Sequence, residues 1–151
     1  MSQNNPIFIG IDAGSSGCRS LAIDQDKKQL AESQVHYPDQ AATGRIAESD
    51  PALWWQALLT SIDRLKDSIA LQAVKGIAVD ATSGSLLLSS ADGQPVAPAL
   101  MYNDGQSSAQ AAQIAQWAPA ESGAHGTGSS LAKLLFLWQK HPHAQLALHP
   151  H

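Results

Sequence analysis

The sequence is poor in the residue types on which several common protein classes depend. Cys18 is the single cysteine in 151 residues, so no disulfide forms within the chain and a reducing compartment is expected. Only nine lysines and arginines are present, scattered along a chain of net charge −4, which disfavours a nucleic-acid surface. The longest apolar run near a predicted helix, Leu134 to Trp138, is far too short to span a bilayer. We therefore expect a cytoplasmic protein whose partners are small molecules or proteins.

Several catalytic signatures are absent as well. No Gly-x-Ser-x-Gly elbow occurs, so serine-hydrolase chemistry is not indicated. No Walker A lysine motif occurs either, so a phosphate site in this chain has to be built from turn backbone and metal. The histidines near the C-terminal end have no cysteine partner and no His-x-x-x-His spacing, which argues against a metal site there: His141, His143, His149 and His151.

The first strongly patterned segment is predicted to form two strands joined by a turn of glycine and serine. Ile7, Ile9 and Ile11 alternate with other positions, and the alternation ends on the carboxylate of Asp12. Glycines that adopt positive φ would let the following turn, Gly14-Ser15-Ser16-Gly17, point several backbone N–H groups at one anion. Asp12 would hold Mg²⁺ beside that anion through water. The alternative is an ordinary β-hairpin whose aspartate caps a turn.

A third strand and a helix are predicted next. Gln29 to Tyr37 alternates weakly after a short loop, which indicates an antiparallel meander of three strands. Asp50-Pro51 supplies an N-cap and a first helical residue. Apolar residues then recur at three- and four-residue steps on a stripe facing the sheet: Trp54, Leu58, Ile62, Leu65 and Ile69. We interpret Trp54 and its neighbour Trp55 as packing residues rather than a ligand platform.

The segment from Val74 to Ser89 repeats the plan of the first motif. A short strand ends at Asp80, the turn Ala81-Thr82-Ser83-Gly84 follows, and Ser85 to Ser89 is predicted to return as a strand. A strand, a crossover helix and a second strand favour parallel pairing, so the first and fourth strands should be neighbours. Asp12 and Asp80 would then share a crevice at the carboxyl ends of the strands, the usual ligand site of open α/β sheets.

After the hairpin signal Asp92-Gly93, an extended segment is predicted to return to this site. It ends in Tyr102-Asn103-Asp104, whose polar residues either contact a ligand or cap a helix that begins near Gln106. Ala109 to Trp117 continues that helix.

A last helix is predicted to start at Ser129 or Ser130 and to stop at Pro142. Its apolar residues lie on one stripe: Leu131, Leu134, Leu135 and Trp138. Lys133 lies near its beginning, and we interpret this side chain as solvated rather than as a phosphate ligand.

In order and spacing these motifs resemble the N-terminal lobe of FGGY-family carbohydrate kinases, most of all the D-ribulokinase and xylulokinase-like pentulose kinases. The resemblance covers essentially the whole chain and rests on Ile9 to Asp24, Ile77 to Tyr102 and Ser129 to Pro142. It implies a ribonuclease H-like α/β fold of the actin and sugar-kinase type, with an antiparallel three-strand meander, a parallel strand and flanking helices. It also implies transfer of the γ-phosphate of ATP, with Mg²⁺, to a hydroxyl of D-ribulose or D-xylulose.

Carried over by position, the resemblance implies a role for each motif. Asp12 would bind Mg²⁺ and the triphosphate as the catalytic residue of this chain, without being the general base. The residues lining the phosphate turn would be Gly14, Ser15, Ser16 and Gly17. The sugar would be contacted by Ser83, in a turn shaped by its neighbours, and by a second polyol ligand, giving a substrate set of Asp80, Thr82, Ser83 and Asp104.

Two residues depart from the family pattern. Ser15 stands where the family usually has threonine, which keeps the hydroxyl. Ala81 stands where glycine is common, and at a turn that needs positive φ an alanine would cost about 1 kcal/mol. Ala81 therefore weakens the substrate assignment slightly.

Family members continue into a second lobe that supplies the general-base aspartate and most of the adenosine pocket. Neither has a counterpart in these 151 residues, so we expect residues 1–151 to form an N-terminal lobe that is inactive alone. The alternatives are a catalytically silent sugar- or nucleotide-binding regulator of the same fold and a self-contained small interaction domain. The expected partners are a sugar and ATP, with neither nucleic acid nor membrane, and a homodimer is left open.

Overall fold

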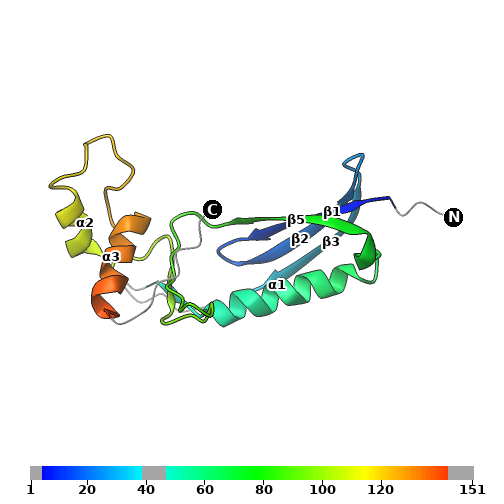
Figure 1. The fold of residues 1–151 in the computed structure, drawn as a ribbon, viewed down its shortest axis with the longest axis horizontal. Helices are drawn as coiled ribbons and strands as arrows, with labels where there is room; N and C mark the ends of the chain where they lie inside the picture. The colour runs from blue at the N-terminus through cyan, green and yellow to red at the C-terminus, as the bar shows by residue number, and fades with distance from the viewer. Residues whose placement is uncertain (1–4, 39–46, 143–151) are drawn as a thin grey trace. The chain divides into compact units, whose positions relative to one another are not determined.

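The structure is a computed structural model that describes residues 5–38 and 47–142 (Figure 1). The chain divides into two compact units. The sheet unit consists of Met1–Pro38 and Ala52–Thr82, and the helical unit consists of Asp39–Pro51 and Ser83–His151. In the described part of the chain, no helix combines the length and the apolar character needed to cross a membrane.

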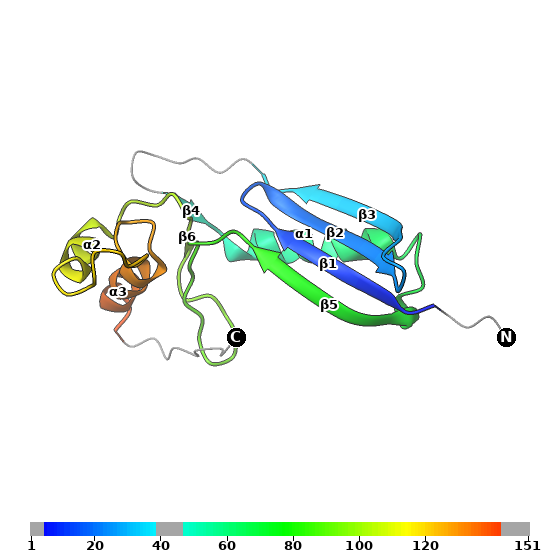
Figure 2. The ribbon, with the colours of Figure 1, turned by 90° about the horizontal axis from the view of Figure 1, so that it is seen from above.

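The sheet unit is built on four strands in the order β3-β2-β1-β5 (Figure 2). β1 pairs antiparallel with β2, β2 pairs antiparallel with β3, and β5 pairs parallel with β1. The strands are β1 (Ile7–Ala13), β2 (Gly17–Asp24), β3 (Gln29–His36) and β5 (Val74–Ala81). This arrangement confirms the predicted meander, the predicted parallel pairing of the first and fourth strands, and the mixed α/β sheet.

Helix α1 (Pro51–Leu65) lies against one face of this sheet, as both ribbon views show. It begins at the proline that the sequence predicts as its first residue, and it buries Ala57, Ser61 and Leu65. The helix ends at Leu65, before the 3₁₀ helix η1 (Leu71–Ala73), although the apolar stripe continues to the buried Ile69. Trp55 is 62% exposed, so the interpretation of this residue as a packing residue was wrong.

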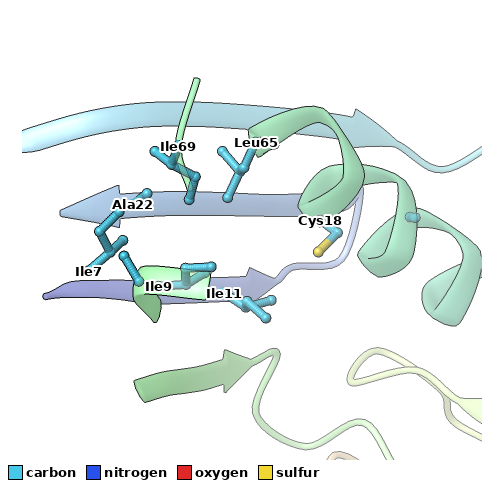
Figure 3. Close-up of a cluster of buried hydrophobic side chains, with 9 residues drawn as sticks. Ile7, Ile9, Ile11, Cys18, Ala22, Leu65 and Ile69 are labelled. Atoms are coloured by element: carbon cyan, nitrogen blue, oxygen red, sulfur yellow. The ribbon is translucent and has the colours of Figure 1, made fainter. Parts of the chain in front are cut away.

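The core of the sheet unit lies between α1 and the sheet (Figure 3). Its buried residues come from every second position of β1, from β2 and from the helix and its continuation: Ile7, Ile9, Ile11, Cys18, Ala22, Ala57, Leu65, Ile69 and Ala73. Because side chains of a strand alternate between faces, burying the three isoleucines turns the intervening positions of β1 to the opposite face. Asp12 lies on that opposite face.

The helical unit contains a short antiparallel pair and two helices. β4 (Glu48–Ser49) pairs with β6 (Ala99–Leu100), and α2 (Ser108–Ile114) contacts α3 (Ser130–Lys140). Two small clusters of buried side chains form its interior. One centres on Leu88, Leu100 and Leu137, and the other is formed by Ala111, Ile114 and Ala132.

The segment after the second motif differs from its prediction. Ser85 to Ser89 does not form a strand, and it makes only isolated antiparallel bridges, from Leu86 to Leu100 and from Ser89 to Pro95. A proline has no N–H to donate to a ladder, so Pro95 contributes no donor to this pairing. The predicted hairpin turn is present, because the Ser90 N–H donates to Gln94 O at 2.8 Å around Gly93, whose φ is 81°.

Both predicted helices of this unit form, with different bounds or faces. α2 is shorter than the predicted run to Trp117. α3 begins at Ser130, one of the two predicted starting residues, and Ser129 is its N-cap, because its Oγ accepts a hydrogen bond from the Leu131 N–H at 3.2 Å. Trp138 is 49% exposed, so the stripe that α3 buries does not include it. The helix buries Ala132, Lys133 and Leu137 instead.

Candidate functional site

Two carboxylates stand side by side where β1 and β5 end. Asp12 and Asp80 are paired positions in the parallel ladder, and both are exposed. Neighbouring strands lie about 4.8 Å apart and paired residues share a face, so the two side chains point to the sheet face opposite α1. The Asp12 carboxylate makes no hydrogen bond or ion pair with a described residue, whereas Asp80 Oδ1 accepts from the Ala81 N–H at 2.9 Å. Two anionic groups are thus held together with spare acceptor capacity.

The turn between β1 and β2 lies directly beside Asp12. The Gly14 N–H donates to Gly17 O at 3.0 Å, and the Tyr37 N–H donates to Ser16 O at 3.0 Å. The N–H groups of Ser15 and Ser16 have no partner among the described residues, and both serines are exposed. A Cβ added to Gly14 would lie 3.8 Å from Asp12 Oδ1, so the carboxylate leans over the turn. The turn therefore offers two free backbone donors next to a carboxylate.

The two glycines of this turn are not needed for positive φ. Among the described glycines only Gly84, Gly93 and Gly126 have positive φ, so the predicted reason for Gly14 and Gly17 was wrong. Gly17 is required by close packing, because a Cβ there would lie 2.5 Å from Val35 O. Strand β3 thus fixes the far side of the turn by steric exclusion.

The pKa of Tyr37 is affected by the charge of Asp12 beside the same turn. Burial raises the pKa of the Tyr37 phenol above its ordinary value, and the charges of Cys18 and Asp12 raise it further. The N–H of this residue also donates to Ser16 O. The negative field of Asp12 therefore extends across the turn to β3 and its continuation.

The turn after β5 carries the predicted sugar-binding residues. The Thr82 N–H donates to Ala13 O at 3.2 Å, which ties the end of β5 to the end of β1. Ala81 is the last residue of β5 and does not have positive φ, so the strain that its alanine was expected to cause is absent. The positive φ falls two residues after Thr82, on Gly84, at 79°. Ser83, between them, is exposed.

Asp104 is buried, with 1% of its surface exposed, and its carboxylate binds protein groups. Oδ2 accepts from the Ala47 N–H at 2.8 Å and from Gln106 Nε2 at 3.1 Å, and Oδ1 accepts from the Gln106 N–H at 2.9 Å. Asp104 therefore fixes the loop between β6 and α2 to the residue before β4. The N-cap of α2 is Ser107, so Asp104 is not its cap. A contact between Asp104 and a sugar stays a prediction.

Lys133 was interpreted as solvated, and that interpretation was wrong. The residue is 0% exposed, and its Nζ donates to Gly84 O at 2.5 Å, Met101 O at 2.8 Å and Tyr102 O at 3.2 Å. Burial lowers the pKa of the Lys133 amine, and the negative charge of Asp104 opposes that shift. The sequence held one signal of this burial, because Lys133 precedes Leu137 by one helical turn on the same face.

The predicted site residues thus fall into two sets. The sheet unit holds the first motif and the start of the second, namely Asp12, Gly14, Ser15, Ser16, Gly17, Asp80 and Thr82, and the helical unit holds Ser83 and Asp104.

Oxygen donors at the sheet edge suit Mg²⁺, which prefers carboxylates together with water and phosphate oxygens. The two aspartates supply such donors without enclosing an ion, and over residues 5–38 and 47–142 no three His, Cys, Asp or Glu side chains gather as a set of metal ligands. His143, His149 and His151 lie outside the described residues. The site therefore fits a metal that arrives with a phosphate ligand.

Comparison with known proteins connects this geometry to one family. Residues 7–148 match the model of the N-terminal domain of the FGGY family of carbohydrate kinases. A xylulose kinase of Streptomyces coelicolor is 29% identical over 151 residues, which cover 95% of this chain and 31% of that enzyme. A xylulose kinase of Staphylococcus xylosus is 26% identical over 106 residues, which cover 70% of this chain and 22% of that enzyme. This chain thus spans about a third or less of the length of these relatives.

The fold agrees with solved structures of the same kind. The crystal structure described as a xyloylose kinase from Brucella ovis superposes with a TM-score of 0.79 at 24% identity, over 90% of this chain and 30% of that one. At this level of identity the likeness establishes the fold, and the family is established by the match over 7–148. With the paired aspartates and the serine turn in the positions that the motifs predicted, the chain belongs to the FGGY family of carbohydrate kinases, whose N-terminal domain it matches.

Proposed function

We propose that this chain is the sugar- and phosphate-binding lobe of a kinase that transfers the γ-phosphate of ATP to a pentulose, D-ribulose or D-xylulose. The observation that carries the proposal is the pairing of Asp12 with Asp80 beside a turn with two free N–H groups. The choice of a pentulose is supported by the relatives named xylulose kinase.

In this proposal, the phosphate groups are bound by the turn between β1 and β2 and by Asp12. The N–H groups and hydroxyls of Ser15 and Ser16 bind phosphate oxygens, since backbone donors in a turn form a concave site for anions. Asp12 would hold Mg²⁺, which when bound would neutralise negative charge on the phosphates. Gly17 keeps the turn in this form, because an added Cβ would lie 2.5 Å from Val35 O.

In this proposal, the sugar is bound by the second motif, at the end of β5 and in the turn after it. The exposed hydroxyl of Ser83 binds a hydroxyl of the pentulose, and Asp80 with Thr82 shapes the turn that presents it. Asp104 contributes by fixing the loop that follows β6, with a direct sugar contact as a further part of the proposal. None of these groups is assigned as the base that deprotonates the sugar hydroxyl.

Phosphoryl transfer needs the nucleophile, the phosphate and the metal to be held in line. Because the general-base aspartate is expected outside these 151 residues, we propose that the isolated chain has almost no kinase turnover. The complete gene product and the isolated chain are therefore assayed in parallel for ADP release over a panel of pentuloses, hexoses and glycerol. ADP release by the isolated chain at a rate typical of kinases would overturn the assignment of this chain as one lobe.

The panel also tests the substrate. We expect the complete gene product to release ADP with D-ribulose or D-xylulose at a kcat/KM at least about tenfold above that for glycerol or a hexose. A preference for glycerol or a hexose would contradict the pentulose assignment. Sugar binding by calorimetry without any ADP release would favour the catalytically silent regulator instead.

A further inference from the structure

Lys133 is a buried cation that no carboxylate neutralises by direct contact in the described part of the chain. An ammonium group has three hydrogen-bond donors, and removing it from water is costly unless they are satisfied. Here the three acceptors are main-chain carbonyls, those of Gly84, Met101 and Tyr102. Each of the three ammonium donors therefore has an acceptor, which explains how a lysine occupies a position with no exposed surface.

The three carbonyls belong to two segments that are distant in sequence. Gly84 follows Ser83 in the turn after β5, and Met101 and Tyr102 lead into Asn103 and Asp104. The two segments already touch through paired backbone bonds, since Leu86 and Leu100 exchange N–H···O bonds of 2.9 and 2.8 Å.

Beyond this pair, the Tyr102 N–H donates to Ser85 Oγ at 3.1 Å, and Lys133 joins the segments where the backbone pairing has ended. The lysine therefore acts at the ends of both segments that carry proposed sugar ligands.

We propose that Lys133 is a positioning residue that holds the Ser83–Gly84 turn and the Tyr102–Asp104 loop in the geometry that receives the sugar, an inference that rests on the proposed function. Without the ammonium group, three carbonyls in a dry site lose their donor, and an unsatisfied buried acceptor is costly. The two segments then separate or admit water. Because Lys133 touches neither sugar nor phosphate in this proposal, its effect is on how the sugar is held.

The experiment compares Lys133→Met with Lys140→Met in the complete gene product. Both substitutions remove one positive charge from α3, but Lys140 is exposed, and its amine lies over the ring of Phe136, 4.4 Å from the ring centroid. We expect Lys133→Met to raise the KM for the pentulose by about tenfold or more, with a change below about twofold in the KM for ATP. Lys140→Met should leave both constants unchanged. Lys133→Arg, which keeps a cationic donor, should recover part of the loss.

Hydrogen exchange provides a second readout that does not depend on turnover. Lys133→Met should speed exchange of the amides in residues 83–86 and 101–104, while the amides of β1, β2 and β3 keep their rates. An unchanged sugar KM, or an equal rise in the sugar and ATP constants with exchange faster throughout, would overturn the inference. If Lys133→Met does not fold, Lys133→Arg is expected to raise the sugar KM selectively by a smaller factor, and an unchanged constant would overturn it.

If the unsubstituted protein turns over no sugar, the proposed function fails. The exchange data then still decide whether Lys133 fixes the two segments, so the two failures are distinguishable.

Discussion

Asp12 and Asp80 are paired across the parallel ladder of β1 and β5, and both side chains lie on the sheet face that α1 leaves uncovered. The chain between them forms the other strands of the meander, α1 and the return to β5. Two negative charges on adjacent strands repel each other unless a cation is present. This relationship is the reason why we propose that metal and phosphate bind to the sheet unit.

Asp12→Asn should abolish most of the kinase activity while leaving sugar binding intact. The amide keeps the size of the side chain but removes the charge that we propose holds Mg²⁺, and we expect kcat to fall by about 100-fold or more. A coupled assay of ADP release at increasing Mg²⁺ concentration measures this effect, and calorimetry measures sugar affinity.

Asp26→Asn is the control for Asp12→Asn, because Asp26 is an exposed carboxylate in the loop between β2 and β3. It should behave like the unsubstituted protein. Full turnover of Asp12→Asn at an unchanged Mg²⁺ requirement would remove Asp12 from the proposed mechanism.

Gly17→Ala should destabilise the sheet unit, and Gly10→Ala should not. An added Cβ at Gly17 would lie 2.5 Å from Val35 O, which is backbone and cannot rotate away, whereas a Cβ at Gly10 has no heavy atom within 4 Å. We expect a loss of about 1–3 kcal/mol in the free energy of unfolding for Gly17→Ala, as for other overpacked sites. Urea denaturation of both variants checks this, and equal stabilities would show that β3 yields to the extra methyl group.

Gly84→Ala and Gly93→Ala separate backbone strain from crowding. Both glycines have a φ near 80°, but a Cβ at Gly84 would lie 3.1 Å from Gly128 O, while a Cβ at Gly93 meets nothing within 4 Å. Gly93→Ala should therefore cost about 1 kcal/mol of folding free energy from strain alone. Gly84→Ala should cost more and should also raise the sugar KM, because its turn carries Ser83. A smaller stability loss at Gly84 than at Gly93 would contradict the geometry.

The phenol of Tyr37 should titrate above its ordinary pKa of 10, and neutralising Asp12 should bring it closer to that value. Residues 1–151 contain two tyrosines, so in the isolated chain a Tyr102→Phe background leaves Tyr37 as the only phenol for ultraviolet titration. Adding Asp12→Asn removes one of the negative charges that raise this pKa. A titration midpoint that does not move would show that Asp12 does not act on Tyr37.

The same shift has a consequence for stability. Between the unfolded pKa and the raised folded pKa, the native state binds more protons than the unfolded chain. The contribution of Tyr37 to stability is therefore fully present below pH 10 and is lost as the pH rises through the folded value.

Much of the sheet unit follows from pattern alone. The alternation of Ile7, Ile9 and Ile11 fixes which face of β1 is buried, and that face determines where Asp12 points. A strand, a helix and a strand then allow one favoured connection, which places β5 beside β1. The relationship between Asp12 and Asp80 is predictable because it depends only on local periodicity and on chain handedness.

The helical unit depends on tertiary contacts that no local pattern specifies. The run Leu86-Leu87-Leu88 has the composition of a strand, yet its pairing is limited to isolated bridges near Leu100 and Pro95. Lysine is a residue type expected at the surface, yet the amine of Lys133 donates to carbonyls of two segments that are distant in sequence, which take the place of water. Trp55 shows the reverse case, an apolar residue left in solvent because α1 turns a different face to the sheet.

Cys18 is a residue of β2 whose side chain lies in the core of the sheet unit, with its Sγ 3.6 Å from the Ser61 hydroxyl and no surface open to solvent. Because it is the single cysteine of the chain, thiol reagents find no native target in the folded state. A cysteine introduced at an exposed position such as Ser16 would therefore accept a fluorescent label without prior removal of the native thiol.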